Sequence, residues 1–499
     1  MHLSSMDVAV VLLYIFMIYT IAIMANRAMK KVHKGAALSN HDVMEKHYLA
    51  GKTITFWEAL MSIIATEFSA LAFLIIPTLV YFDNMSYIRF IIGACISRAL
   101  IAFFFLPHVY GKGLTIFEVL ARGIHGYKIL NKEGESGRRT FAFFYIISKV
   151  VGVSVKLLGG AILIADFFNI SLFAAIVSIS TMTYIYILVG GLKAVVRTDM
   201  LQASMFILGG IAAHHVIGQM SSYSWSELVV FGIKAGKFDF WSGDYGFLHF
   251  IYGILAGIAY DAATHGVDQD LTQKLFGAKD KETAKKALAW SALGSLLVNL
   301  VFLSLGVVLW AYYTKHGKAV PPPDKIFSHL IENNFPSPLK GLMVASILAA
   351  CMSTLDSSIN ALSSVMWNDL LNVKKSKMIR VYINMDNFII TLAIVMMAFL
   401  FSMIPNSLKF GMQFAYLATA PLLAFFICRM LFAKHIRINF SSSLIVLTFG
   451  FTFIGMGINH FRLGFDPQLT ILWGIMTTVL FMWTYSRITD YIEAREKKS

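Results

Sequence analysis

Apolar residues along this chain gather in runs of about 20, the length that an α-helix needs to cross roughly 30 Å of hydrocarbon. Polar and charged residues fall mostly in the short segments between these runs. We predict about 13 membrane-spanning helices from this pattern. Their approximate ranges are 7–26, 54–81, 88–109, 141–168, 171–189, 199–219, 246–264, 287–313, 341–370, 382–404, 410–432, 441–461 and 468–486. The chain is therefore expected to be an all-α polytopic membrane protein.

The distribution of basic residues predicts the orientation of these helices. An odd number of spans puts the two termini on opposite sides of the membrane. If the N-terminus lies outside, about 29 Lys and Arg fall in inner segments and about 9 in outer ones, the bias that the positive-inside rule requires. The basic inner segments include 27–53, 110–140 and 265–286. We expect a multi-pass protein of the cell (inner) membrane with its C-terminus in the cytoplasm.

Composition excludes several other classes of protein. The chain is 57% hydrophobic and 14% charged, whereas soluble domains are about a quarter charged. Its net charge of +14 is accounted for by the basic inner segments, so no nucleic-acid partner is expected. Its three cysteines all lie within apolar runs and show no disulfide or metal-ligand spacing. No nucleophile–base pair or metal motif suggests an enzyme.

Two of the predicted spans carry polar clusters, at 65–70 (ATEFSA) and 349–360 (AACMSTLDSSIN). Such clusters are tolerated within a membrane only where they face protein or water. Hydroxyl and carbonyl oxygens that converge on one point suit Na⁺, which prefers oxygen ligands. A broken helix supplies free carbonyls, and Ser and Thr on a second helix supply hydroxyls. The two clusters therefore predict a cation site.

Four segments resemble motifs of the sodium:solute symporter family, and they occur in the order and spacing of that family. They are 48–52 (YLAGK), 190–202 (GGLKAVVRTDMLQ), 264–274 (THGVDQDLTQK) and 350–360 (ACMSTLDSSIN). The resemblance extends from about residue 45 to residue 370. The family transports many different solutes, so the resemblance does not identify the cargo.

The resemblance implies a leucine-transporter-type core, in which two groups of five helices form an inverted repeat and the first and sixth core helices are broken at mid-membrane. The broken helices would be 54–81 and 246–264, with Gly253, Gly257 and the polar pair 260–261 marking the second break. The implied organisation is an additional N-terminal helix and basic loop (1–53), a first repeat (54–219), a second repeat (220–432), and two further helices with a cytoplasmic tail (433–499).

The same resemblance implies the ligands of one Na⁺. They would be the carbonyl oxygens of Ala65, Phe68 and Ala350 and the hydroxyls of Ser353 and Thr354. The alternative is that the two hydroxyls bond back to carbonyls of their own helix, as hydroxyls within membranes often do.

A second cation site is suggested by Asp199 and Ser357, because some family members use these two positions. Asp356 stands where members that bind two sodium ions carry a further hydroxyl. That acid could bind Na⁺ directly, carry a proton in its place, cap a helix or pair with a lysine.

Glu67 lies beside the first predicted break, where an ionised carboxylate is costly unless it is paired. Arg98 and Lys156 are the cations in neighbouring core helices. One interpretation is a structural pair between Glu67 and Arg98, and the other is that one of these three charges orients the substrate. Four further residues are predicted to line the substrate site: Ser69, Phe73, Tyr260 and Gln413.

These features together predict a sodium-driven symporter that imports a small polar organic solute by alternating access. A sugar, sugar acid, amino acid or organic acid would fit, with Na⁺ as the co-transported ion and no cofactor. The alternatives are a proton-coupled symporter that uses Asp199 and Asp356, and a transporter-like membrane sensor without turnover.

Overall fold

The computed structural model describes residues 3–32, 40–122, 132–241, 247–318, 320–321, 326–371, 379–404, 420–428, 442–462 and 467–496. Within these ranges every named element is helical. Seven of the helical stretches are long and apolar enough to cross a membrane. Only 420–428 of the predicted span 410–432 is described, and Gln413 lies outside the described residues.

The helices follow the order of the predicted spans. Their bounds are α1 (Ser5–Val32), α2 (Asn40–Tyr48), η1 (Ala50–Lys52), α3 (Phe56–Glu67), α4 (Ala70–Phe82), η2 (Met85–Tyr87), α5 (Ile88–Leu100), η3 (Ile101–Phe105), α6 (Leu106–Val109), α7 (Ile116–Arg122), α8 (Lys132–Phe168), α9 (Leu172–Met220), α10 (Trp225–Lys234), α11 (Phe247–Asp261), η4 (Ala262–Val267), α12 (Gln269–Phe276), α13 (Lys281–Lys315), α14 (Ile326–Asn334), α15 (Leu339–Val365), η5 (Met366–Leu370), α16 (Ile379–Ser402), α18 (Ser442–Arg462) and α19 (Pro467–Glu496).

The predicted span 54–81 is broken, as the family resemblance implied. α3 ends at Glu67, Phe68 and Ser69 are extended with ψ of 105° and 167°, and α4 begins at Ala70. A helix that ends leaves its last carbonyl groups without partners in its own backbone. The break therefore provides free backbone oxygens in the middle of the protein.

The second broken helix is interrupted at the polar pair 260–261, as we predicted, and not at the two glycines. α11 continues through Gly253 and Gly257 to Asp261, and a π-helical turn and an extended Asp268 then separate it from α12. The two glycines serve close packing instead, because a Cβ atom on Gly257 would lie 2.0 Å from the carbonyl oxygen of Phe90 on α5. Glycine at these positions lets α11 approach α5, and it does not mark the break.

α9 contains the two predicted spans 171–189 and 199–219 in one helical stretch that is interrupted at Gly191. Gly191 has φ of +55°, a conformation that glycine adopts without strain. A Cβ atom there would also lie 2.8 Å from Nδ1 of His47. The chain therefore reverses at Gly191 while packed against the end of α2.

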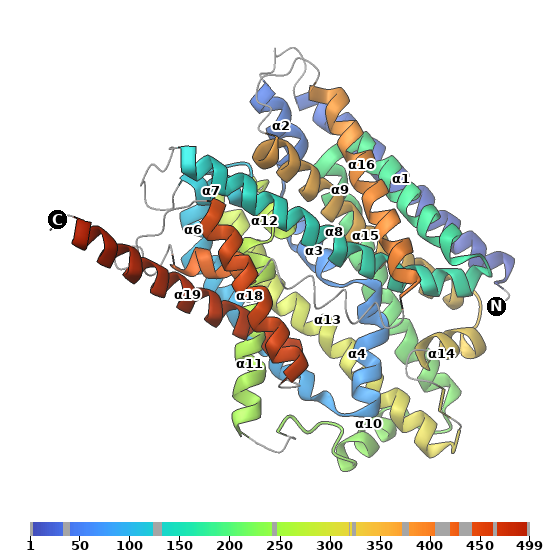
Figure 1. The fold of residues 1–499 in the computed structure, drawn as a ribbon. Helices are drawn as coiled ribbons and strands as arrows, with labels where there is room; N and C mark the ends of the chain where they lie inside the picture. Colours follow the sequence, from blue (N-terminus) through green and yellow to red (C-terminus); the bar gives the residue numbers. More distant parts are fainter. Residues whose placement is uncertain are drawn as a thin grey trace.

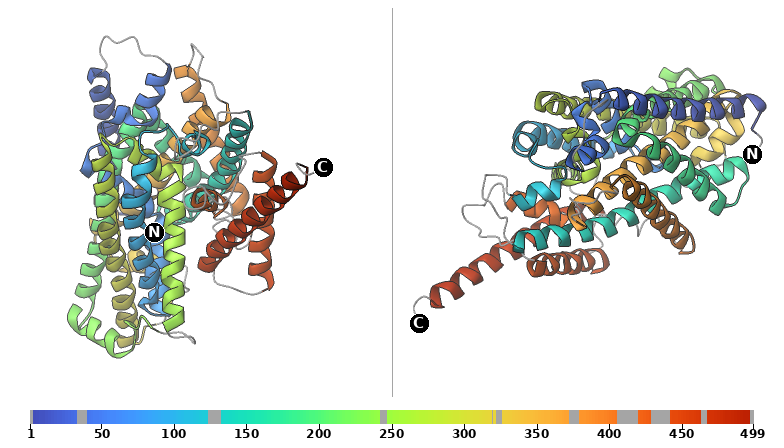
Figure 2. Two further views of the ribbon diagram at one scale, coloured as in Figure 1. Left: turned by 90° about the vertical axis from the view of Figure 1, so that its left-hand side faces the viewer. Right: turned by 90° about the horizontal axis from the view of Figure 1, so that it is seen from above.

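The helices form a bundle in which α1 and α19 lie on opposite sides, while α2 and α7 mark one end and α10 the other (Figures 1 and 2). α15 is buried along nearly its whole length, among α1, α8, α9 and α16. α3 lies against α9, α13 and α15. This arrangement brings the break after α3 next to the polar face of α15.

Candidate functional site

The break between α3 and α4 lies against the polar segment of α15. Oγ1 of Thr66 is 3.1 Å from Oγ of Ser357. On α8, a Cβ atom added to Gly160 would lie 2.1 Å from Sγ of Cys351 and 3.1 Å from Cβ of Ala70. Because α4, α8 and α15 are so close here, the free carbonyls of the break and the hydroxyls of α15 occupy the same region.

The five residues predicted to bind Na⁺ are all buried in this region. Oγ1 of Thr354 donates to the carbonyl oxygen of Ala350 at 3.1 Å, which is the bond back to its own helix that we weighed as the alternative. Ser353 instead donates to Oδ1 of Asp199 at 2.6 Å. The hydroxyl of Ser353 therefore links α15 to α9, and Ala65 and Phe68 lie at the end of α3.

Asp199 is the centre of a buried polar cluster that also contains a cation. Its Oδ2 accepts hydrogen bonds from Oγ of Ser62 at 2.5 Å and from Nζ of Lys274 at 2.9 Å. The Lys274 ammonium also donates to the carbonyl oxygen of Ser62 at 3.1 Å and to the hydroxyl of Thr66. The side chains of Asp199 and Lys274 are both 0% exposed. The Lys274 amine therefore lies where we predicted that a second cation would bind to Asp199.

Asp356, the acid that departs from the family pattern, lies beside this cluster. Its Oδ2 accepts a hydrogen bond from the hydroxyl of Tyr186 at 2.5 Å, and its Oδ1 is buried without a hydrogen-bond partner. Ser357, the third residue predicted for the second site, contacts Thr66. The structure therefore brings the three predicted residues into one region and adds Lys274 to them.

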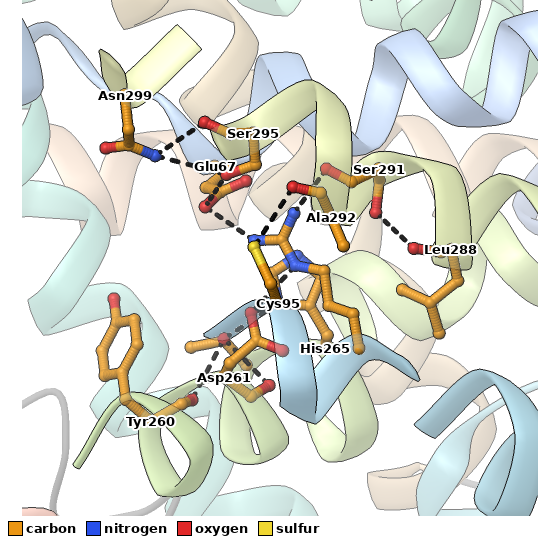
Figure 3. Close-up of polar contacts among 12 residues, drawn as sticks. Glu67, Cys95, Tyr260, Asp261, His265, Leu288, Ser291, Ala292, Ser295 and Asn299 are labelled. Atoms are coloured by element: carbon orange, nitrogen blue, oxygen red, sulfur yellow. Dashed lines mark hydrogen bonds and ion pairs between the residues drawn. The ribbon is translucent and has the colours of Figure 1, made fainter. Parts of the chain in front are cut away.

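A second buried cluster surrounds Arg98 and joins α3, α5, α11 and α13 (Figure 3). Nη2 of Arg98 lies 2.6 Å from Oε1 of Glu67, in an ion pair that is not aligned as a hydrogen bond. Nε donates to Oδ1 of Asp261 at 3.0 Å, and Nη1 donates to the carbonyl oxygen of Ser291 at 3.0 Å. Glu67 and Arg98 therefore form the ion pair of the first of our two interpretations, and Asp261 is a second carboxylate on the same guanidinium.

Several polar groups extend this cluster. Nδ1 of His265 lies 2.9 Å from Oδ1 of Asp261, and Oγ of Ser295 donates to Oε1 of Glu67 at 2.7 Å. Four atoms of the cluster are buried without a hydrogen-bond partner: Oε2 of Glu67, Nη2 of Arg98, Oδ2 of Asp261 and Nε2 of His265. Unpartnered buried polar atoms are rare in proteins, and they are typical of sites that bind a ligand, an ion or water.

The other residues predicted to contact substrate occupy varied positions. Ser69 is buried at the start of α4, and Phe73 packs between Phe206 and Phe302, with ring centroids 4.4 and 4.9 Å apart. Tyr260 immediately precedes Asp261 and packs against Phe90. Lys156 forms no hydrogen bond or ion pair with any residue of the described ranges.

A further layer of ion pairs fixes α12 against α8 and α15. Nζ of Lys149 lies 2.7 Å from Oδ2 of Asp268 and 2.8 Å from Oδ2 of Asp270. Tyr145 donates to Asp268 at 2.7 Å, and Ser358 donates to Asp270 at 2.7 Å. Every residue of α12 is buried. These contacts hold α12 against α8 and α15, next to the clusters around Asp199 and Arg98.

Sequence reasoning missed the partners of the charged groups more often than the groups themselves. Lys274 lies in a motif that we singled out, but its pairing with Asp199 joins residues 75 positions apart. Ser62, Tyr186 and Ser295 carry no motif and become functional candidates only through their contacts. A polar residue within an apolar span was the one signal available for them.

Comparison with known proteins agrees with this architecture. The chain is 24% identical over 334 residues to sodium-coupled monocarboxylate transporter 1 of Mus musculus, which covers 65% of this chain and 53% of that protein. It is also 24% identical over 340 residues to the sodium/sialic acid symporter NanT of Aliivibrio fischeri, covering 65% and 64% respectively. The chain therefore matches between about half and two thirds of the length of these relatives.

A solved structure shares the fold of almost the whole chain. It is a Na⁺-coupled sialic acid symporter in a substrate-bound outward-open state, with a TM-score of 0.82, 18% sequence identity, and coverage of 97% of this chain and 98% of that one. This likeness establishes the leucine-transporter-type fold. The family model described as "Sodium:solute symporter family" matches residues 47–450. The chain is therefore a membrane protein that belongs to the sodium:solute symporter family, a family of transporters.

Proposed function

We propose that this protein is a Na⁺-coupled symporter that carries a small polar organic solute into the cell by alternating access. The observation that supports this most directly is the meeting of the α3 break with the hydroxyls of α15. Ala65 and Phe68 offer backbone oxygens there, and Ser353 and Thr354 offer hydroxyls. A Na⁺ ion bound among these oxygens would hold the break against α15.

The broken helices also supply a place for the solute. Glu67 lies at the end of α3, and Asp261 lies at the end of α11. Ends of broken helices leave backbone groups free to bind polar solutes in transporters of this architecture. The unpartnered atoms around Arg98 lie between these two ends. We assign solute binding to this region.

The driving force follows from the charge that moves. One positive charge that moves inward gains about 2.3 kcal/mol per 100 mV. Because 1.4 kcal/mol corresponds to a factor of ten, one Na⁺ supports roughly 50-fold accumulation of a neutral solute from the voltage alone. A second co-transported charge would raise this to roughly 2,000-fold.

The cluster around Asp199 favours a single Na⁺ per cycle. The Lys274 ammonium already provides a positive charge to Asp199. Proton coupling through Asp356 is the second candidate, because its Oδ1 is buried without a hydrogen-bond partner. If Asp356 were protonated, its side chain would be uncharged. Lys274 and Asp199 would then remain beside it as a pair with no net charge.

The test is the thermal unfolding of purified protein in NaCl and in KCl at equal ionic strength. We expect NaCl to raise the unfolding temperature, because an ion that binds only the folded state stabilises it by mass action. Ser353→Ala should abolish the difference. Ser346→Ala is the matched control, since Ser346 is also buried on α15 but donates to the carbonyls of Met205 and Leu342.

A Na⁺-specific rise that survives in Ser353→Ala would contradict the proposed ion site. Absence of any Na⁺-specific rise in the unaltered protein would contradict sodium coupling as a whole. The melts would then be repeated across pH with Asp356→Asn, to test the proton-coupled alternative.

A further inference from the structure

The charges at the two broken helices also restrict the kind of solute, and this inference rests on the proposed transport function. Arg98 is the one cation of the described cluster, and its guanidinium is already engaged. It lies against Glu67, donates to Asp261 and donates to the carbonyl oxygen of Ser291, and its side chain is 1% exposed. A carboxylate solute would have to displace one of these partners in order to bind the guanidinium.

The atoms that remain without partners are mainly hydrogen-bond acceptors. Oε2 of Glu67 and Oδ2 of Asp261 are carboxylate oxygens, which accept hydrogen bonds and donate none when ionised. Nε2 of His265 is a third unpartnered atom, and it is an acceptor when Nδ1 carries the proton towards Asp261. The one unpartnered donor is Nη2 of Arg98, which already lies in the ion pair with Glu67, so the cluster has more free acceptors than free donors.

The net charge of the cluster points the same way. Two carboxylates face one guanidinium, so the sum is −1 with a neutral imidazole and zero with a protonated one. It is not positive in either form. A buried carboxylate that is not balanced by a cation costs several kcal/mol, so a bound positive charge is favoured here.

Lys156 does not alter this balance. It lies on α8 and forms no ion pair with Glu67, Asp261 or any other residue of the described ranges. Two further lysines of the described residues lie near the breaks, and both are paired: Lys274 with Asp199, and Lys149 with Asp268 and Asp270.

We propose that the transported solute carries a protonated amine, which donates hydrogen bonds to the free oxygens of Glu67 and Asp261. An ammonium group supplies several donors and a positive charge at once. It would satisfy both carboxylate oxygens without disturbing Arg98. Hydroxyl groups of the same solute would supply donors to the remaining acceptors but could not replace the charge.

The experiment uses three small molecules that share one skeleton and differ in one group: ethanolamine, ethylene glycol and glycolate. Each is titrated into the purified full-length protein in saturating NaCl, with KCl added to keep ionic strength constant, and the unfolding temperature gives an apparent Kd. We expect ethanolamine to bind at least about tenfold more tightly than the other two, a difference of about 1.4 kcal/mol.

Two variants test whether the preference arises from this cluster. Glu67→Gln and Asp261→Asn should each reduce the preference for ethanolamine to less than about threefold. Glu58→Gln is the matched control, because Glu58 is a buried glutamate at the opposite end of α3, where it pairs with Lys193 at 2.8 Å. Its preference should equal that of the unaltered protein.

Stabilisation by glycolate or ethylene glycol equal to that by ethanolamine would overturn the inference, as would no stabilisation by ethanolamine. A preference that persists in both cluster variants would also overturn it. The rise produced by Na⁺ alone is recorded in the same melts. If Na⁺ raises the unfolding temperature but ethanolamine is not preferred, only this inference is contradicted. If Na⁺ does not raise the unfolding temperature, the sodium-coupled function is contradicted.

Discussion

Replacing Lys274 by Met tests whether the buried amine stands in for a cation. Methionine preserves the length and the apolar stem of the side chain but removes the charge. Asp199 would lose its bond from Nζ at 2.9 Å and keep those from Ser62 at 2.5 Å and Ser353 at 2.6 Å. Because both members of the pair are fully buried, water does not replace the lost partner.

The expected size of the effect follows from these contacts. Breaking a buried ion pair by removing one partner costs about 3–5 kcal/mol. The two remaining hydroxyl donors place Lys274→Met at the lower end, near 3 kcal/mol, since hydrogen bonds to a charged group are worth about 1.5–3 kcal/mol each. A cation that enters the vacated position should restore stability. At 100 times its Kd, Na⁺ would return about 2.7 kcal/mol.

The assay is a NaCl titration of the unfolding temperature, with KCl as the balancing salt. Lys274→Met should unfold at a lower temperature than the unaltered protein in KCl and should gain more from NaCl. The double variant Lys274→Met with Asp199→Asn is the control, because it removes both charges and should lose the additional response to Na⁺. If Lys274→Met responds to NaCl no more than the unaltered protein does, the amine does not occupy a cation position.

Three further predictions concern the frame around the site. Arg98→Met should leave the buried Asp261 and the partly buried Glu67 without their guanidinium partner and lower stability by about 3–5 kcal/mol; a normal yield of monodisperse protein and a normal unfolding temperature would contradict it. Gly257→Ala should cost about 1–3 kcal/mol or more, because its Cβ would lie 2.0 Å from the carbonyl oxygen of Phe90. Gly218→Ala meets no atom within 4 Å and should be neutral or stabilising by up to about 1 kcal/mol in the same melts. Lys237→Met should cost about 1–3 kcal/mol, because the ammonium donates to the carbonyls at the end of α4; an unchanged melt would show that these bonds do not stabilise α4.

The features that the sequence predicted best are those with a high free-energy cost inside a membrane. Glu67 and Arg98 are charged residues within apolar spans, and the cost of an unpaired intramembrane charge made their contact one of two interpretations. The break after α3 was implied by the family resemblance, and the polar cluster at 65–70 indicated that this segment faces protein or water. For the charged pair, one strong physical penalty leaves few arrangements open.

Of the markers predicted for the second break, the polar pair 260–261 was right and the two glycines were wrong. Glycine within an apolar helix serves either as a break or as a point of close helix packing, and its sequence neighbourhood does not separate the two uses. Gly253 and Gly257 pack against α5, whereas the helix is interrupted after Asp261. The pairing of Lys274 with Asp199 was also beyond sequence reasoning, because it depends on how α12 lies against α9.

The short helix α3 contacts both α11 and α12, the two halves of the second broken helix, through buried polar groups. These contacts restrict which helices can separate from one another during transport. Through Glu67, α3 contacts Arg98, which binds the end of α11, and through Thr66 it contacts Lys274 of α12. Separating buried ionic partners costs several kcal/mol, so movement of α3, α5, α11 and α12 as one body is favoured. α9 is also joined directly to α3, because Lys193 pairs with the buried Glu58 and Asp199 accepts a hydrogen bond from Ser62. α3 therefore separates from α9 only if these contacts open together with the one between Lys274 and Asp199. A cation that takes the place of the amine at Asp199 would offset part of that cost, while the charges around Arg98 stay together.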